Sequence, residues 1–163
     1  MKPLLNLNEL DDYESSKQGS FAEKYSVVSD KIGAVKLGYS VTIVPPGCKT
    51  CPFHNHRINE EMFLILEGHG TLRFGEEEYP LKPQDIIACP PGGREVAHQI
   101  VNTSDADIKY LCLSTNDPYD ICEYPDSNKV LAVVGTQGNR EFTHMSKADD
   151  AVGYYEGEPN AKD

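Results

Sequence analysis

The sequence lacks the features that nucleic acids and membranes select in their partners. It has 15 Lys and Arg against 26 Asp and Glu, a formal net charge of −11, so neither a nucleic acid nor an anionic membrane is an expected partner. No apolar run approaches the roughly 18 to 20 residues that span a bilayer, and residues 1–8 are too polar for a signal peptide. We therefore expect a cytoplasmic protein.

Tryptophan is absent, and the cysteines are too few and too scattered for a secreted disulfide framework. Their number is odd, and they are Cys48, Cys51, Cys89, Cys112 and Cys122. The Cys48-x2-Cys51 spacing is compatible with a redox pair or half of a zinc site, but no second cysteine pair has partner spacing. We therefore expect free thiols in a loop, and an inert buried thiol at Cys89.

Apolar residues recur in short runs that predict β-strands. Residues 37–43 alternate strictly between apolar and polar, which indicates a half-buried strand, and two prolines follow it. Further strand-like runs are separated by turn residues and cover 62–66, 71–74, 79–81, 85–89, 96–101 and 108–113. Eleven prolines, thirteen glycines and no convincing long helix predict an all-β antiparallel sandwich or barrel.

A chain of 163 residues has room for a single domain around one core. We expect that core over residues 37–114. Residues 1–36 are interpreted as an N-terminal arm and strand, with an arm or short helix over 1–23. Residues 115–163 are rich in Pro, Asp and Gly and hold one strand-like piece at 130–134. They predict an extension that wraps the core, because they contain too few large apolar residues for a core of their own.

Three histidines and a glutamate have the spacing of a transition-metal site. His54 and His56 project to one face of a strand, because side-chain direction repeats every two residues. Glu61 follows a turn or bulge, and His98 closes the site from a strand distant in sequence. Glu60 is an alternative ligand that strand parity disfavours. Imidazole and carboxylate donors suit Zn, Fe, Mn, Ni, Co or Cu, whereas Ca and Mg prefer oxygen shells.

These residues lie within two motifs that resemble those of the cupins. The motifs are Gly47-x6-His54-x-His56-x4-Glu61-x6-Gly68 and Pro91-x-Gly93-x4-His98-x3-Asn102. The resemblance is strongest to small single-domain bacterial cupins of the sugar-phosphate (mannose-6-phosphate) isomerase-like type. It implies a double-stranded β-helix, or jelly-roll, barrel that is usually a homodimer. It also implies one divalent metal ion (Zn, Fe, Mn or Ni) held by His54, His56, Glu61 and His98.

The sequence departs from the usual cupin pattern in two turns. The spacing from Gly47 to His54 is one residue longer than is common, and Gln84 stands where a glycine usually precedes the aspartate. Both positions lie outside the expected ligand set, so they affect loop shape alone.

Three cations near the motifs are candidates for binding an anionic substrate. Arg94 follows the Gly-Gly turn before His98, while Arg57 and Lys49 lie on the other ligand-bearing loop. Guanidinium and ammonium groups bind phosphate or carboxylate well, although solvated surface cations are the commoner case.

The leading hypothesis from the sequence is a metal-dependent enzyme that acts on a small polar or anionic metabolite. The resemblance suggests a sugar-phosphate isomerase-like reaction. An Fe, Mn or Cu dioxygenase is an alternative, because the same ligands hold redox metals. A non-catalytic small-molecule sensor or binding protein is the third possibility.

Overall fold

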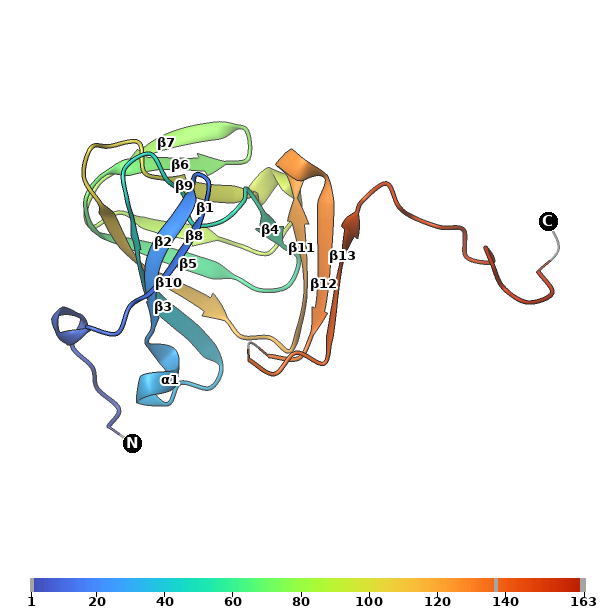
Figure 1. Ribbon diagram of the computed structural model, residues 1–163, viewed down its shortest axis with the longest axis horizontal. Helices are drawn as coiled ribbons and strands as arrows, with labels where there is room; N and C mark the ends of the chain where they lie inside the picture. Colours follow the sequence, from blue (N-terminus) through green and yellow to red (C-terminus); the bar gives the residue numbers. More distant parts are fainter. Residues whose placement is uncertain (1, 137, 162–163) are drawn as a thin grey trace.

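The computed structural model describes residues 2–136 and 138–161, and β-strands dominate it (Figure 1). Its strands are β1 (Glu14–Gln18), β2 (Phe21–Val27), β3 (Leu37–Val44), β4 (Asn55–His56), β5 (Glu61–Glu67), β6 (Gly70–Phe74), β7 (Glu77–Leu81), β8 (Ile86–Cys89), β9 (His98–Val101), β10 (Ile108–Thr115), β11 (Tyr119–Tyr124), β12 (Lys129–Val134) and β13 (Phe142–Lys147). The helix α1 (Ser29–Ile32) and three 3-10 turns (Leu7–Glu9, Arg94–Val96 and Pro125–Ser127) complete the described elements. Among these residues no helix is both long and apolar enough to cross a bilayer.

The strands form three antiparallel sheets around one barrel (Figure 1). A six-stranded sheet has the order β1-β2-β3-β10-β5-β8, and a three-stranded sheet β7-β6-β9 lies opposite it. A four-stranded sheet has the order β13-β12-β11-β4 and is called the small sheet below. Its last strand is the short β4, which carries His56. This arrangement is the double-stranded β-helix expected from the sequence.

The core fills the space between the six-stranded sheet and the three-stranded sheet β7-β6-β9, and period-two patterning on β5 places its residues there. On β5, Phe63 and Ile65 are buried while their neighbours Met62 and Leu64 are only half-buried. These two residues pack with apolar side chains of their own sheet and of the three-stranded sheet, including Val44, Leu72, Leu81, Ile87, Ile100, Ile108 and Tyr110. A strand buried on one face shows this alternation. On β3 the apolar alternation is misleading, because Ser40, Thr42 and Val44 face the barrel interior while Leu37 is exposed.

Two polar features of the motifs have structural explanations. Asn102 is completely buried, and its amide nitrogen donates to the carbonyls of Val44 and Ala106 at 2.8 and 2.7 Å. It therefore ties the turn before β10 to the end of β3.

Gln84 has φ of 76°, a left-handed conformation that glycine adopts without strain. The usual glycine at this position is thus explained by backbone geometry, and this chain tolerates glutamine in the same conformation.

The N-terminal region differs from the arm or short helix that we expected over residues 1–23. After the 3-10 turn at Leu7–Glu9, β1 and β2 form a hairpin that extends the edge of the six-stranded sheet. Every residue of β1 is exposed, so the strand has no apolar alternation by which to recognise it. Its backbone hydrogen bonds to β2 hold it in the sheet instead.

The region after residue 115 forms most of the small sheet. β11 pairs with β4 through Cys122 with His56 and Glu123 with Asn55, and β12 and β13 continue the sheet outward. Arg73 links this region to the barrel, because its guanidinium lies over the Phe53 ring and pairs with Asp126 at 2.9 Å. Beyond β13 the described chain runs away from the body of the molecule (Figure 1).

The cysteines are free thiols, as expected. Cys89 is 2% exposed within the core cluster, and burial raises the pKa of its thiol. Cys48 and Cys51 are half-buried and unpaired with one another. An inert buried thiol at Cys89 is consistent with this environment.

We expect Gly68→Ala to destabilise the fold by about 3 kcal/mol or more. Gly68 has φ of 81°, and a Cβ there would lie 2.2 Å from the Asp107 carbonyl oxygen, so strain and a clash with backbone combine. Gly19→Ala is the matched control, since Gly19 has φ of 61° and open space around it, and it should lose only about 1 kcal/mol. Denaturant unfolding measures both, and equal losses would contradict the packing argument.

Candidate metal centre

Three imidazoles converge inside the barrel on one oxygen of the Glu61 carboxylate. The Nε2 atoms of His98, His56 and His54 lie 2.9, 3.4 and 3.7 Å from Glu61 Oε2. His98 is 3% exposed, and the other three are largely buried. All four residues proposed from the sequence as ligands are thus brought to one point.

Strand pairing creates this convergence. His54 and His98 form an isolated antiparallel bridge, with His54 N donating to His98 O at 3.2 Å and His98 N to His54 O at 2.7 Å. His56 lies two residues further on, in β4, and faces the same point. Glu61 begins β5 with its carboxylate turned inward. Glu60 is exposed, and its hydrogen bonds are made by its backbone: the amide donates to Thr115 Oγ1 and the carbonyl accepts from Thr115 N. Strand geometry thus separates the two glutamates, as parity predicts.

Backbone carbonyls orient two of the imidazoles. His54 Nδ1 lies 2.9 Å from the Pro52 oxygen, and His98 Nδ1 lies 3.2 Å from the Val96 oxygen. A ring nitrogen beside a carbonyl oxygen donates its proton there, so the lone pair of the neutral ring is on Nε2. Both lone pairs consequently point toward the centre of the cluster.

A carboxylate that sequence reasoning missed orients the third imidazole. His56 Nδ1 lies 2.5 Å from Asp120 Oδ2, and Asp120 also accepts hydrogen bonds from Asn59 Nδ2 at 2.8 Å and Ile58 N at 3.1 Å. Asp120 belongs to β11, and its side chain is 3% exposed. No motif spacing identifies it, because only the pairing of β11 with β4 brings it to His56. Carboxylate contacts of this kind hold ligating imidazoles in one tautomer.

The group of His54, Glu61 and His98 could hold a transition-metal ion. Donor atoms about 2.1 Å from one ion lie about 3.0 to 3.5 Å apart in octahedral or tetrahedral geometry, and the three distances from imidazole Nε2 atoms to Glu61 Oε2, 2.9 to 3.7 Å, are close to this range. Donor atoms of His54, Glu61 and His98 lie within 4.8 Å of one another. A second group with this proximity comprises His56, Asp120 and Cys122. We interpret it as the orienting contact of His56, because Asp120 binds Nδ1 while Nε2 faces Glu61.

Protons and a metal ion compete for this cluster. Burial lowers the pKa of His54, but hydrogen bonding with Cys51 and Glu61 outweighs it and raises the pKa to about 10. For His56, burial is likewise outweighed by Asp120, Cys122 and Glu61, and the pKa rises to about 12. Burial raises the pKa of Glu61, yet the three imidazoles hold it well below its usual range. Because ligating imidazoles must be neutral, metal binding would release protons.

Two cavities border the cluster, and Glu61 lines both of them. A cavity of about 470 Å³ includes His54 and Glu61 and extends under β1, β2, β3, β5 and β10. A smaller one of about 160 Å³ includes His56, Glu61, Asp120 and Arg140. A ligand in either cavity would lie beside the imidazoles.

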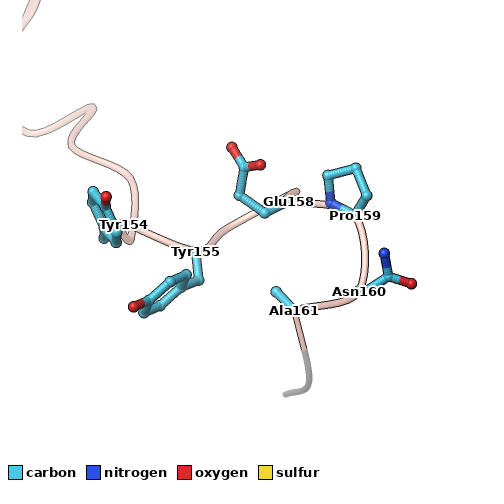
Figure 2. A pocket seen from close by; sticks show the side chains of 6 residues that line it. All are labelled: Tyr154, Tyr155, Glu158, Pro159, Asn160 and Ala161. Atoms are coloured by element: carbon cyan, nitrogen blue, oxygen red, sulfur yellow. The ribbon is translucent and has the colours of Figure 1, made fainter.

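A third hollow has no connection with these side chains. It is formed by six residues of one C-terminal segment, Tyr154, Tyr155, Glu158, Pro159, Asn160 and Ala161 (Figure 2). The segment contributes no histidine or cysteine to it. Its position on the projecting chain separates it from the barrel interior (Figure 1).

The three cations expected to bind substrate do not line either cavity beside the cluster. Arg57 pairs with Glu123 at 2.8 Å, and Arg94 lies 3.4 Å from Asn128 Oδ1. Lys49 lies over the Phe21 ring, 5.0 Å from its centroid. Substrate binding by these residues stays a prediction. Arg140, which does line the smaller cavity, gave no signal in the sequence.

Comparison with known proteins agrees with this geometry. Residues 40–114 match the family model of the cupin domain. This range contains His54, His56, Glu61 and His98. The chain contains a cupin domain. An uncharacterized protein of Methanocaldococcus jannaschii is 38% identical over 80 residues, covering 49% of this chain and 61% of that protein. Auxin-binding protein 1 of Arabidopsis thaliana is 33% identical over 90 residues, covering 50% and 43%. The chain thus spans less than two thirds of these curated relatives.

Two solved cupin structures share the fold over nearly the whole chain. A proposed sugar phosphate isomerase from Acidithiobacillus ferrooxidans has a TM-score of 0.81 at 23% identity, covering 93% of this chain and 96% of its own. A sugar phosphate isomerase of the cupin superfamily from Silicibacter pomeroyi has a TM-score of 0.75 at 23% identity, covering 91% and 95%. At this identity the likeness concerns the fold, and it extends beyond the matched 40–114 segment.

We expect Asp120→Asn to lower the pKa of His56 by about 1 to 3 units, because the carboxylate charge that favours the imidazolium is removed. Imidazole ¹⁵N chemical shifts followed against pH in metal-free protein measure the change. Asp117→Asn is the control, since Asp117 lines the same small cavity and has no bond to an imidazole. A shift of similar size in both variants would contradict a specific role for Asp120.

Proposed function

We propose that the chain is a metal-dependent cupin enzyme that acts on a small polar or anionic metabolite, most specifically by sugar-phosphate isomerisation. The observation that carries this proposal is the convergence of three imidazole Nε2 atoms and Glu61 Oε2 at the wall of a 470 Å³ cavity. Buried, preoriented donors beside a cavity that holds a small molecule are what such a catalyst requires.

The side chains divide the work of such a site. His54, His56, Glu61 and His98 would hold the ion. When bound, a divalent ion supplies Lewis-acid polarisation of a substrate carbonyl. Asp120 holds the His56 ring. Phe63 packs edge-on against His98, with centroids 5.8 Å apart, and keeps water from that side of the cluster.

Relatives support the isomerase version at the level of fold. Both solved structures named above align with more than 90% of this chain. Because their identity to this chain is 23%, the reaction itself is our proposal. A homodimer and a cytoplasmic location remain predictions from the sequence.

A non-catalytic binding protein is the second candidate, and a specific likeness favours it. Auxin-binding proteins from Arabidopsis thaliana and Nicotiana tabacum are 33% and 32% identical to this chain over about half its length. The name of these relatives describes binding rather than catalysis. The two candidates differ in turnover, which the second experiment below measures.

We expect His54→Ala and His98→Ala to abolish stoichiometric metal binding, because each removes a donor from the cluster around Glu61. Elemental analysis of protein produced without a purification tag gives the metal content. His69→Ala is the control, since His69 is exposed in the turn before β6 and should retain full metal. Circular dichroism verifies folding of each variant. Unchanged metal content in the folded His54 or His98 variant would refute the site.

We expect metal-loaded protein to exchange a solvent deuteron into at least one aldose or ketose phosphate, because isomerisation removes and returns a proton beside the carbonyl. Proton NMR of a sugar-phosphate panel in D₂O detects the exchange, with metal-stripped protein as the control. Oxygen uptake with an Fe-loaded or Cu-loaded form would indicate the oxygenase instead. Ligand binding without turnover, persisting after metal removal, would indicate the binding protein.

A further inference from the structure

The large cavity beside His54 has a wall of hydroxyl groups and carboxylates. Of the described residues that line it, none is Lys or Arg. Six lining residues carry a hydroxyl group, and they are Ser16, Tyr25, Ser40, Thr42, Thr50 and Tyr110. Two of these hydroxyls satisfy each other, since Thr50 Oγ1 and Tyr110 Oη lie 2.6 Å apart. The cavity is therefore rich in groups that both donate and accept hydrogen bonds, and away from His54 its lining carries no positive side chain that would pair with an anion.

Glu23 is the acidic group of this cavity that the metal cluster does not use. It lies on β2 opposite Ser16 of β1, and on the same strand face as Tyr25, which also lines the cavity. Its side chain is half-buried, and its carboxylate makes no hydrogen bond or ion pair within the described residues. Tyr25, by contrast, donates its hydroxyl to Glu14 at 2.7 Å. Burial raises the pKa of Glu23, as expected for a carboxyl group without a cation beside it.

The sheet order separates Glu23 from the candidate metal ligands. β2, β3, β10 and β5 are consecutive neighbours, so two strands lie between Glu23 and Glu61, and the strand registers also offset the two residues along the sheet. A ligand that reaches from His54 into this cavity therefore presents its far end to Glu23. An unpaired acceptor at that end favours a hydroxyl donor, and the negative charge of Glu23 disfavours a phosphate or carboxylate there.

We propose that this cavity binds an uncharged, polyhydroxylated ligand, and that Glu23 selects it by accepting a hydrogen bond from a hydroxyl group at its far end. The inference rests on the proposed function, because the near end of the same ligand is taken to lie at His54 and Glu61. It adds that an anionic substituent of the ligand lies away from Glu23 and outside this cavity, whose lining includes no Lys or Arg.

Glucose, mannose and fructose, each compared with its own 6-phosphate, test the selection. Backbone ¹⁵N shifts of Zn²⁺-loaded and of EDTA-stripped protein are followed during titration with each of the six compounds. We expect at least one free sugar to shift amides of β2 and β3, and its phosphate ester to bind about tenfold more weakly in this cavity. Tighter cavity binding by the esters, or no cavity shift with any of the six, would overturn the proposal.

Variants of Glu23 test whether this side chain causes the preference for the free sugar over its phosphate ester. Glu23→Gln should weaken binding of the free sugar about tenfold, since a charged acceptor becomes a neutral amide. Glu23→Lys should reverse the preference in favour of the ester. Glu77→Gln, an exposed glutamate on β7, is the matched control and should change neither affinity. Equal affinities in wild type and Glu23→Gln would overturn the role of Glu23.

The metal content of each sample keeps this proposal distinct from the proposed function. Protein that binds no metal, but binds sugar in a manner that depends on Glu23, would contradict the metal-dependent enzyme and support the cavity assignment. The opposite result is metal-bound protein that exchanges deuterium into a phosphate ester at the same rate with and without Glu23→Gln. That result would support the metal-dependent enzyme and contradict the cavity assignment.

Discussion

The buried carboxylate of Glu61 imposes the constraint on which the rest of this site depends. An inward-facing charge inside a barrel is costly unless hydrogen bonds and opposite charge compensate it. Three imidazoles supply that compensation, and each is turned toward Glu61 by a contact on its other ring nitrogen. Protons or a metal ion can provide the positive charge. The same geometry therefore explains both the stability of the cluster and its suitability as a metal centre.

The C-terminal region contributes directly to this cluster. β11 joins β4 and brings Asp120 to His56, while Glu123 binds both the buried Asn55 side chain and Arg57. Both residues of β4, Asn55 and His56, are thus held by side chains that lie more than sixty positions later in the chain. A region that looks like an accessory wrapping in the sequence is part of the wall of the site.

Much of the fold could be predicted wherever one strand face is buried. The runs that became β5 and β10 follow apolar spacing, because residues two apart share a face and the core requires apolar ones. β3 is an exception, since it turns Ser40, Thr42 and Val44 inward. The β1–β2 hairpin escaped prediction because β1 is exposed throughout and is held by backbone hydrogen bonds. Gln84 shows a related limit: its left-handed conformation comes from the turn, and glutamine gives no indication of it.

The sequence by itself predicted a β-barrel from its short apolar runs, and the resemblance of two motifs to those of the cupins identified the four residues that meet at its centre. Only the tertiary structure decided what surrounds them. The pairing of β11 with β4 brought in Asp120, and the β1–β2 edge brought Glu23 and a set of hydroxyl groups into the cavity. It also placed Arg57 beside Glu123, outside the cavities next to the cluster. Such contacts join residues far apart in the chain, so no local pattern encodes them.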